Sequence, residues 1–357
     1  MPRLDVAPNY SLFAGVLQDP AQLTLLSAEQ FGHVIDAADQ SRLLGWLIGQ
    51  AEQGRVPPAL PAWLRDRLAS AEVEANAYDR AMRWEIDRLG RAFFSTGLHW
   101  ILLKGAAYLG AGLSPGRGRR VADIDILVAR DDLSGAERAL VEHGWEFSPL
   151  DAYDIRYYRE WMHELPPLRH RDRRSTVDVH HAILPRTSRL KPSSERLIER
   201  AERRNGLYVL CPSHMVLHGA AHLFHDGEIA GAIRDLVDLD QLLREFGRDP
   251  AFWTDLMQEA KVLGLGRSSY YALRYAVNWF NTPVPPEVLE ETARHAPPWP
   301  VGLLMDLLVT RSISGASGHL SRAAALALYV RSHWLRMPPL QVVRHLTRKS
   351  LYHPEPR

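Results

Sequence analysis

The chain has 357 residues, which is too long for one minimal core and enough for one enzymatic domain with additions. Lys and Arg number 43 and Asp and Glu 42, so the net charge of +1 gives the whole protein no strong attraction to nucleic acid. The single cysteine, Cys211, excludes an internal disulfide framework, and no apolar run approaches the ~20 residues of a membrane span. The N-terminus lacks a signal-peptide pattern, so we expect a folded cytoplasmic protein.

The first region, residues 1–94, has the apolar spacing of helices. The prolines at 57, 58 and 61 separate two of them, because proline cannot continue a helix. The segment Arg83–Phe94 is expected to be a helix that ends near Gly97. We therefore expect an N-terminal helical region.

The second region, residues 95–205, alternates short strands with helices. Strands are expected at His99–Leu103, Val121–Val128, Trp145–Phe147, Tyr157–Arg169 (broken by two prolines) and Thr176–His180. One helix is expected at Ala106–Gly110, and another begins after Asp131 or Asp132 and stops at Gly144. This order predicts an α+β fold with a small mixed sheet.

The third region, residues 206–357, has helical spacing throughout. Its expected helices are Pro212–Phe224, Ile233–Phe246, Arg267–Phe280, Pro286–His295 and Ala323–Leu335. The Ser- and Gly-rich stretch 314–318 is expected to be a mobile loop. From Ser312 onward seven cations face one acid, a local charge of 7 − 1 = +6 that could favour an anionic partner, although a solvated helix face is the commoner explanation.

Two carboxylates stand two residues apart in the expected strand Val121–Val128. Asp123 and Asp125 therefore leave the same face, with Ile124 and Ile126 on the other. Their repulsion needs compensation, for which a divalent cation is the usual solution. Asp178, in the later strand, could reach the same site as a ligand or general base. An isolated Asp-x-Asp is more often a solvated edge, but here both acids precede a helix and oppose apolar residues.

A phosphate site is expected where the first strand of this region ends. Gly105 opens a helix there, and the backbone N–H groups at a helix N-terminus favour phosphate. The glycine-rich loop that follows could bring Arg119 toward a triphosphate. Lys104 could pair with a phosphate or with one of the acids, or have no role.

These motifs together resemble an uncharacterised bacterial nucleotidyltransferase family of the DNA polymerase β-type superfamily. The family pattern is LKG, then R, then DIDLLV, followed by an acid-x-His strand. Its counterparts here are Leu103-Lys104-Gly105, Arg119, Asp123–Val128 and Asp178-Val179-His180, with helical signatures at Leu217–His222 and Arg234–Leu239.

The resemblance implies a polymerase-β-type catalytic core with an NTP substrate and Mg²⁺, two ions, or Mn²⁺ in their place. Asp123, Asp125 and Asp178 would be the catalytic carboxylates and metal ligands. Lys104, Gly105, Ala106 and Arg119 would line the nucleotide, although the wider superfamily has serine where this chain has Ala106.

Four histidines share one side of the expected helix Pro212–Phe224. They stand at i, i+4, i+8 and i+11 as His214, His218, His222 and His225. Such spacing can bind Zn²⁺, with Asp226, Asp235 or Asp238 as a partner, but histidines on an apolar helix are more often packed and hydrogen-bonded. An intermediate hypothesis has His218 and His222, with His180, surrounding the carboxylates and orienting Asp178 or the substrate.

Several functions therefore remain open. The favoured one is a Mg²⁺-dependent nucleotidyltransferase that moves an NMP group from an NTP to a hydroxyl or phosphate on a small molecule, peptide or protein. The alternatives are transfer to tRNA or another RNA, a zinc hydrolase built on the histidines, and a catalytically inactive nucleotide sensor. The sequence identifies neither the acceptor nor the preferred NTP.

Overall fold

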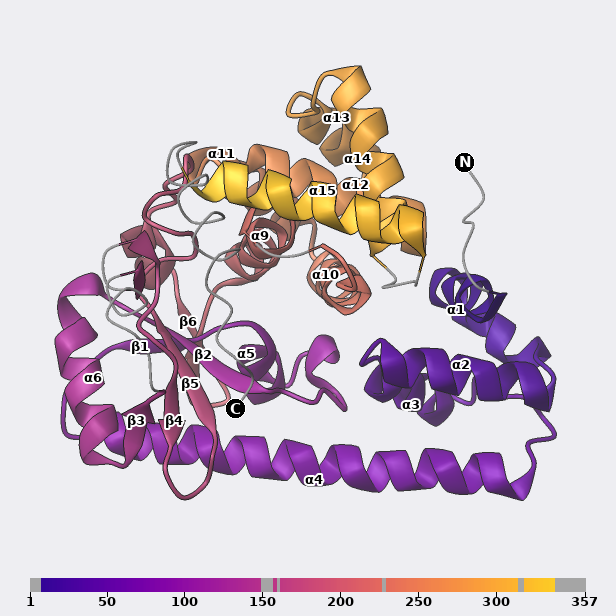
Figure 1. The fold of residues 1–357 in the computed structure, drawn as a ribbon, viewed down its shortest axis with the longest axis horizontal. Coiled ribbons are helices and arrows are strands. Elements are labelled where there is room, and N and C mark those ends of the chain that lie inside the picture. The colour runs from indigo at the N-terminus through magenta and orange to yellow at the C-terminus, as the bar shows by residue number, and fades with distance from the viewer. Residues whose placement is uncertain (1–7, 149–156, 159–160, 227–228, 314–317, 338–357) are drawn as a thin grey trace.

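The structure is a computed structural model that describes residues 8–148, 157–158, 161–226, 229–313 and 318–337. The expected loop at 314–318, apart from Gly318, and most cations of the basic C-terminal segment lie outside the described residues. Figure 1 shows a sheet flanked by α5 and α6, a layer of C-terminal helices along one side, and a separate group of N-terminal helices joined to the sheet by the long helix α4.

The N-terminal region is helical, as the sequence predicts. Its elements are α1 (Pro8–Gln18), the 3-10 helix η1 (Pro20–Leu25), α2 (Ala28–Gln40), α3 (Leu44–Glu52) and α4 (Ala62–Phe93). Helix α2 begins with a capping box, in which Ser27 and Gln30 each accept a backbone N–H of the other. Helix α4 has 32 residues and begins at Ala62, far before the expected Arg83, because no proline or glycine interrupts the chain between Ala62 and Leu89.

A seven-stranded mixed sheet forms the centre of the second region. Its strands are β1 (Trp100–Leu102), β2 (Asp123–Val128), β3 (Trp145–Phe147), β4 (Leu168–His170), β5 (Thr176–His180), β6 (Glu202–Arg204) and β7 (Leu207–Val209). Their order is β3-β4-β5-β2-β1-β7-β6, with parallel pairing of β2 to β5 and of β1 to β7. The central strand β2 is buried at every position after Asp123, and its neighbours β1 and β5 are buried at most of theirs.

Helices α5 (Lys104–Ala111) and α6 (Leu133–Glu142) connect the first strands, and short 3-10 helices η2 (Ser114–Gly116) and η3 (Arg130–Asp132) precede β2 and α6. Helix α6 follows Asp132 and ends before Gly144, whose φ of 92° suits a residue without a side chain. Helix α4 contacts both α5 and α6 with its C-terminal half and α3 with its N-terminal half.

The remaining elements are helical. They are α8 (Ser194–Glu199), α9 (Pro212–Ala221), the π-helical stretch η4 (His222–Asp226), α10 (Ile233–Phe246), α11 (Pro250–Val262), α12 (Gly266–Phe280), α13 (Pro286–Ala293), α14 (Trp299–Ser312) and α15 (His319–Arg336). Helix α9 is buried among α10, α11 and α12. Among the described residues, no helix is long and apolar enough to cross a bilayer.

The predicted α+β class is confirmed by this mixed sheet with helical flanks. Two local expectations were wrong. Among its described residues, the segment 157–169 contains strand only at β4 and an isolated bridge at Glu164, because Pro166 and Pro167 interrupt the ladder. The stretch directly after residue 206 is also not helical, since β7 (Leu207–Val209) is a strand of the sheet.

Candidate functional site

The three predicted carboxylates meet on one face of the sheet. Strands β2 and β5 run parallel with Asp125 opposite Asp178, and Asp123 lies two residues before Asp125. Ile124 and Ile126 point to the opposite face and are buried there. The alternation that buries these isoleucines therefore holds the carboxylates side by side.

Asp125 is the most enclosed of the three, with 5% of its surface exposed. Its Oδ1 atom accepts hydrogen bonds from Lys104 Nζ at 3.0 Å and from His180 Nε2 at 2.9 Å. Burial would raise the pKa of this carboxyl, but Lys104 and His180 outweigh burial and hold the pKa well below its usual range. Asp125 is therefore ionised at neutral pH.

The negative charges of Asp123 and Asp178 are less well balanced by nearby cations than that of Asp125. Burial, followed by the charge of Asp125, raises the pKa of both, and that of Asp178 reaches about 7. The Oδ1 atom of Asp178 is buried and has no hydrogen-bond partner among the described residues. A buried oxygen beside two other carboxylates is the donor set that a hard divalent cation would satisfy.

Helix α5 begins beside these carboxylates. Lys104 is its first residue and has a φ of 45°, which turns the chain sharply between β1 and the helix. No side chain caps the N-terminus of α5, so its first N–H groups are available to an anion. Gly105 and Ala106 are both buried at this start, and Lys104 contacts Asp125 through its ammonium group.

Arg119 lies directly over Gly105. A Cβ atom at Gly105 would be 2.6 Å from Arg119 Nε, so this close approach requires glycine. The guanidinium forms a buried ion pair with Asp238 of α10 and lies 5.5 Å from the centre of the Tyr108 ring. Its Nε atom is buried and has no hydrogen-bond partner among the described residues. Arg119 is thus held at the start of α5 by Asp238, with one donor unused.

The predicted neighbours His218 and His222 also lie near the carboxylates. Burial and the nearby charge of Lys104 lower the pKa values of both rings. The Lys104 charge and burial lower the pKa of His222 to about 3, so this ring is neutral at physiological pH. A neutral imidazole next to the site can donate one hydrogen bond and accept another without adding charge.

Two further residues lie beside the site that the sequence does not indicate, His163 and Glu164. The backbone of this pair runs antiparallel to the end of β5, with Glu164 bridged to His180 and Leu165 N donating to Val179 O at 2.9 Å. His180 Nδ1 lies 3.3 Å from Glu164 Oε2. In the sequence, the consecutive pair His163-Glu164 shortly before the two prolines is the feature that could have indicated these residues. A strand expected over that segment does not by itself place the pair beside β5.

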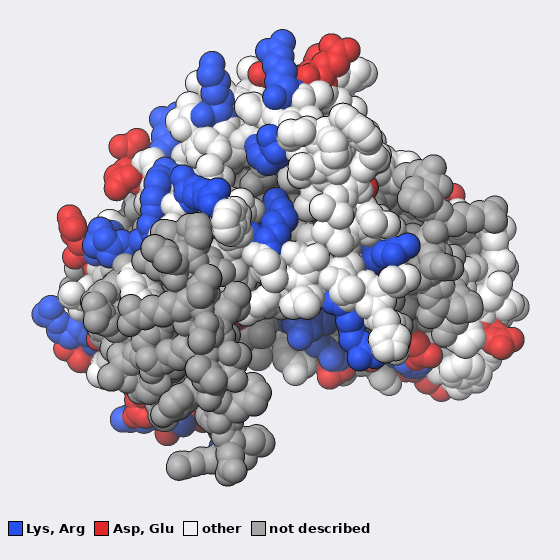
Figure 2. Space-filling model, turned by 45° about the horizontal axis from the view of Figure 1, so that its top comes forward, with Lys and Arg blue, Asp and Glu red and all other residues white. Residues whose placement is uncertain are grey.

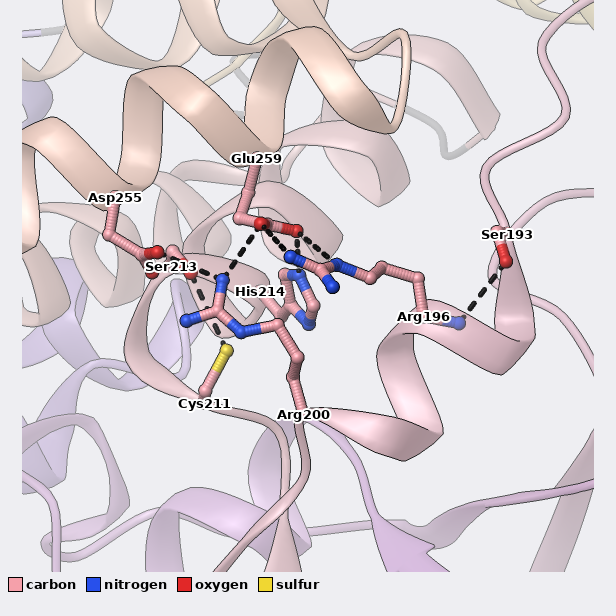
Figure 3. Close-up of polar contacts among 8 residues, drawn as sticks. All are labelled: Ser193, Arg196, Arg200, Cys211, Ser213, His214, Asp255 and Glu259. Atoms are coloured by element: carbon pink, nitrogen blue, oxygen red, sulfur yellow. Dashed lines mark hydrogen bonds and ion pairs between the residues drawn. The ribbon is translucent and has the colours of Figure 1, made fainter.

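The four histidines of the stripe do not share one environment. His214 Nε2 donates to Glu259 Oε2 at 2.8 Å, within a cluster that also contains Arg196 and Arg200 (Figure 3). His225 Nε2 lies 2.8 Å from Ser188 Oγ. The stripe therefore does not bring its histidines to one point, and among the described residues the only group with metal-ligand spacing is His163, Glu164 and His180.

Comparison with known proteins gave one match. A family model described as an uncharacterised nucleotidyltransferase matches residues 27–281, more than two thirds of the chain. The matched segment contains the carboxylates, the start of α5 and α9 through α12. Neither the curated proteins nor the solved structures contain a match to this chain.

Proposed function

This chain belongs to the family of uncharacterised nucleotidyltransferases, and from that premise we propose that it transfers an NMP group from an NTP to a hydroxyl or phosphate acceptor with the help of Mg²⁺. The observation that carries the proposal is the convergence of Asp123, Asp125 and Asp178 on one face of β2 and β5. The active site proposed here is a polymerase-β-type carboxylate centre.

The residues present fit a magnesium centre. Three carboxylates lie together, Asp178 has an unsatisfied buried oxygen, and the pKa values of Asp123 and Asp178 are raised by burial and by mutual repulsion. Oxygen donors are the ligands that Mg²⁺ prefers. When bound there, Mg²⁺ would neutralise the triphosphate and favour ionisation of the acceptor hydroxyl.

The transfer itself requires a base and an anchored triphosphate. The acceptor oxygen forms a bond to the α-phosphorus, the bond from that phosphorus to the bridging oxygen breaks, and pyrophosphate leaves. Asp178 is suited to take the proton of an attacking hydroxyl, because its pKa of about 7 lies near neutral pH. Lys104 and His180 fix Asp125 in its ionised form beside it.

The start of α5 is the proposed triphosphate contact. Its first N–H groups have no side-chain cap, and the unused Nε donor of Arg119 lies beside Gly105. Asp238 holds the rest of the guanidinium, so Arg119 would approach a phosphate with one donor only. Because Ala106 has no hydroxyl, the proposed contact has a backbone N–H but no side-chain donor at this position.

An assay with NTPs labelled at the α-phosphate tests the proposal. The purified chain is incubated with each of the four NTPs, Mg²⁺ and a mixture of small molecules, RNA and proteins, and label is followed into each fraction. Asp123→Asn is expected to abolish transfer, since it removes one anionic oxygen from the centre. Asp172→Asn, the same change at an exposed turn, is the matched control and retains activity.

The distribution of label also identifies the acceptor class. We expect label in the small-molecule, peptide or protein fraction rather than in RNA. Transfer by Asp123→Asn at the wild-type rate contradicts the proposed site. Pyrophosphate release from none of the NTPs contradicts the proposed activity and favours a nucleotide sensor.

A further inference from the structure

A second group of side chains with the spacing of metal ligands lies next to the carboxylates, and His180 belongs to it. It consists of His163, Glu164 and His180, whose candidate ligand atoms all lie within 4.8 Å of one another. Two imidazoles and one carboxylate are a donor set for zinc rather than for magnesium. His163 and His180 are buried, whereas the Glu164 side chain is 18% exposed.

The spacing of Glu164 and His180 suits a shared ion. Ligands about 2.0–2.1 Å from a tetrahedral zinc lie about 3.3–3.4 Å from each other. The distance from His180 Nδ1 to Glu164 Oε2 is 3.3 Å. The His163 and His180 rings are neighbours, with centroids 5.2 Å apart.

The backbone fixes these residues in place. Glu164 is bridged to His180, and His163 O accepts the N–H of His181 at 2.8 Å. Ligands held by a strand and its antiparallel neighbour lose little freedom when an ion binds.

The far side of the His180 ring supplies an independent argument. Its Nε2 atom donates to Asp125 Oδ1 at 2.9 Å, which leaves Nδ1 directed at Glu164. A metal-bound histidine nearly always donates its other ring N–H to a carboxylate, a backbone carbonyl or water, and this bond fixes the tautomer and strengthens the ligand. Asp125, His180 and the site beside Glu164 thus have the arrangement of a carboxylate–histidine–zinc triad.

We propose that His163, Glu164 and His180 bind one zinc ion, with a coordination position open to water. The ion orients His180 so that its Nε2–H holds Asp125 Oδ1, which leaves the other oxygen of Asp125 for the carboxylate centre. This zinc site is distinct from the histidine stripe on α9 and does not depend on the proposed nucleotide transfer.

Metal titration of the full-length chain tests the proposal. The protein is stripped with a chelator, titrated with zinc against a coloured zinc indicator, and its bound metal is counted by mass spectrometry. We expect one zinc per chain that millimolar Mg²⁺ does not displace, since nitrogen ligands disfavour magnesium. Cys211 is buried and lies outside the cluster, so it does not supply a competing thiolate.

Variants locate the ion. Glu164→Gln and His163→Ala are each expected to weaken zinc binding by more than the about 10–100-fold that loss of an outer hydrogen-bond partner costs. Two controls, Asp123→Asn at the carboxylate centre and His225→Asn on the stripe, are expected to keep their zinc. Glu164→Gln keeps the test decisive if His163→Ala does not fold, because Glu164 is partly exposed.

Three results overturn the proposal. The first is a stripped chain that takes up no zinc, which would leave His180 as a protonated imidazolium between Asp125 and Glu164. The second is zinc retained by Glu164→Gln, and the third is zinc lost by Asp123→Asn or His225→Asn. Transfer activity enters none of these measurements, so failure here is separate from failure of the proposed enzyme.

Discussion

Asp125 and Asp178 are register partners on adjacent strands, yet their surroundings give them opposite acid strengths. Lys104 and His180 both donate to Asp125, whereas Asp178 faces the negative charges of Asp125 and Glu164 and has one buried oxygen without a partner. Two carboxylates with separated pKa values are typical of a site in which one group holds charge and the other exchanges a proton. Ionised Asp178 therefore weakens the metal-free fold.

The variant Asp178→Asn is expected to stabilise the metal-free protein while it abolishes transfer. At pH 8 the change removes an uncompensated buried charge, and we expect the free energy of unfolding to rise by about 0.5–2 kcal/mol, the usual gain when a functional site is relieved. Chemical denaturation in the presence of a chelator measures this gain. Asp172→Asn changes the same charge at an exposed position and is expected to leave stability unaltered.

A fall in the stability of Asp178→Asn, or an equal gain in Asp172→Asn, contradicts this explanation. The first result would mean that Asp178 makes a favourable contact in the metal-free state. The second would mean that net charge, and not the crowding at β5, determines the effect.

At the scale of elements, the N-terminal helices contact the loop that carries Arg119. Gly45, near the start of α3, lies against the backbone of Gly118, and a Cβ atom at Gly45 would be only 2.2 Å from Gly118 O. Helix α3, the turn η2 and helix α10 also border a cavity of about 810 Å³. The N-terminal region is thus packed against the loop between η2 and β2.

Paired glycine substitutions in α3 test this contact. Gly45→Ala is expected to lower the free energy of unfolding by about 1–3 kcal/mol, because overpacking displaces the Gly118 backbone. Gly49→Ala, one helical turn later, meets no atom within 4 Å and should raise stability by up to about 1 kcal/mol through helix propensity. Denaturant melts of both variants, with transfer assays, measure the difference.

If the packing positions Arg119, Gly45→Ala also weakens NTP binding, whereas Gly49→Ala does not. Equal stability of the two variants would show that the glycine contact does not hold the loop in place.

The elements with strong local patterns could be predicted from the sequence. Strand β5 and helix α10 have the expected bounds, because β-branched alternation in one and an apolar stripe in the other determine them locally. Strands β6 and β7 were missed, since three-residue strands carry little pattern and depend on pairing with each other and with β1. Glu164 was missed for a similar reason, as only its pairing with β5 places it next to His180.

In the candidate site, too, some residues could be placed from local sequence patterns and others could not. The positions of Asp123, Asp125 and Asp178 follow from strand alternation and a parallel pair. The partner of Arg119 does not, because Asp238 lies far along the chain on α10 and reaches the loop only through tertiary packing. From the sequence Asp238 is a possible partner of a zinc-binding histidine, whereas in the structure it pairs with Arg119 from a different region of the chain.

The whole molecule has a layer of C-terminal helices along one side of the sheet. Figure 2, which brings the upper helices forward, shows a wide area of uncharged residues with Lys and Arg scattered through it and acids mainly toward the margins. Exposed apolar side chains on α14 and α15 include Trp299, Leu303, Leu326 and Trp334. The stability of this layer must therefore come from its inner contacts.

Glu259 is the charged centre of those contacts. It is fully buried on α11 and binds Arg196 and Arg200 of the α8 segment, each at 2.8 Å, as well as His214 of α9 (Figure 3). The hydrogen bond from Arg196, with that from His214, outweighs burial and lowers the pKa of Glu259 to about 2. Three segments are thus joined through one carboxylate.

Glu259→Gln is expected to cost about 3 kcal/mol at pH 7, because it leaves two guanidinium groups without their buried partner. A carboxyl whose pKa is depressed in the folded state stabilises the fold above its unfolded pKa of 4.5 and loses that contribution as the pH falls toward 2. The difference in the free energy of unfolding between wild type and Glu259→Gln should therefore be constant from pH 7 to about 5 and shrink steadily below pH 4.5. Urea unfolding at pH 7, 5, 4 and 3 measures this difference.

The matched control is Glu290→Gln, an equal charge change on an exposed face, which should stay within about 0.5 kcal/mol of wild type throughout. A difference that does not shrink in acid would show that the amide disrupts packing rather than charge, and would remove Glu259 as the electrostatic link between α8, α9 and α11.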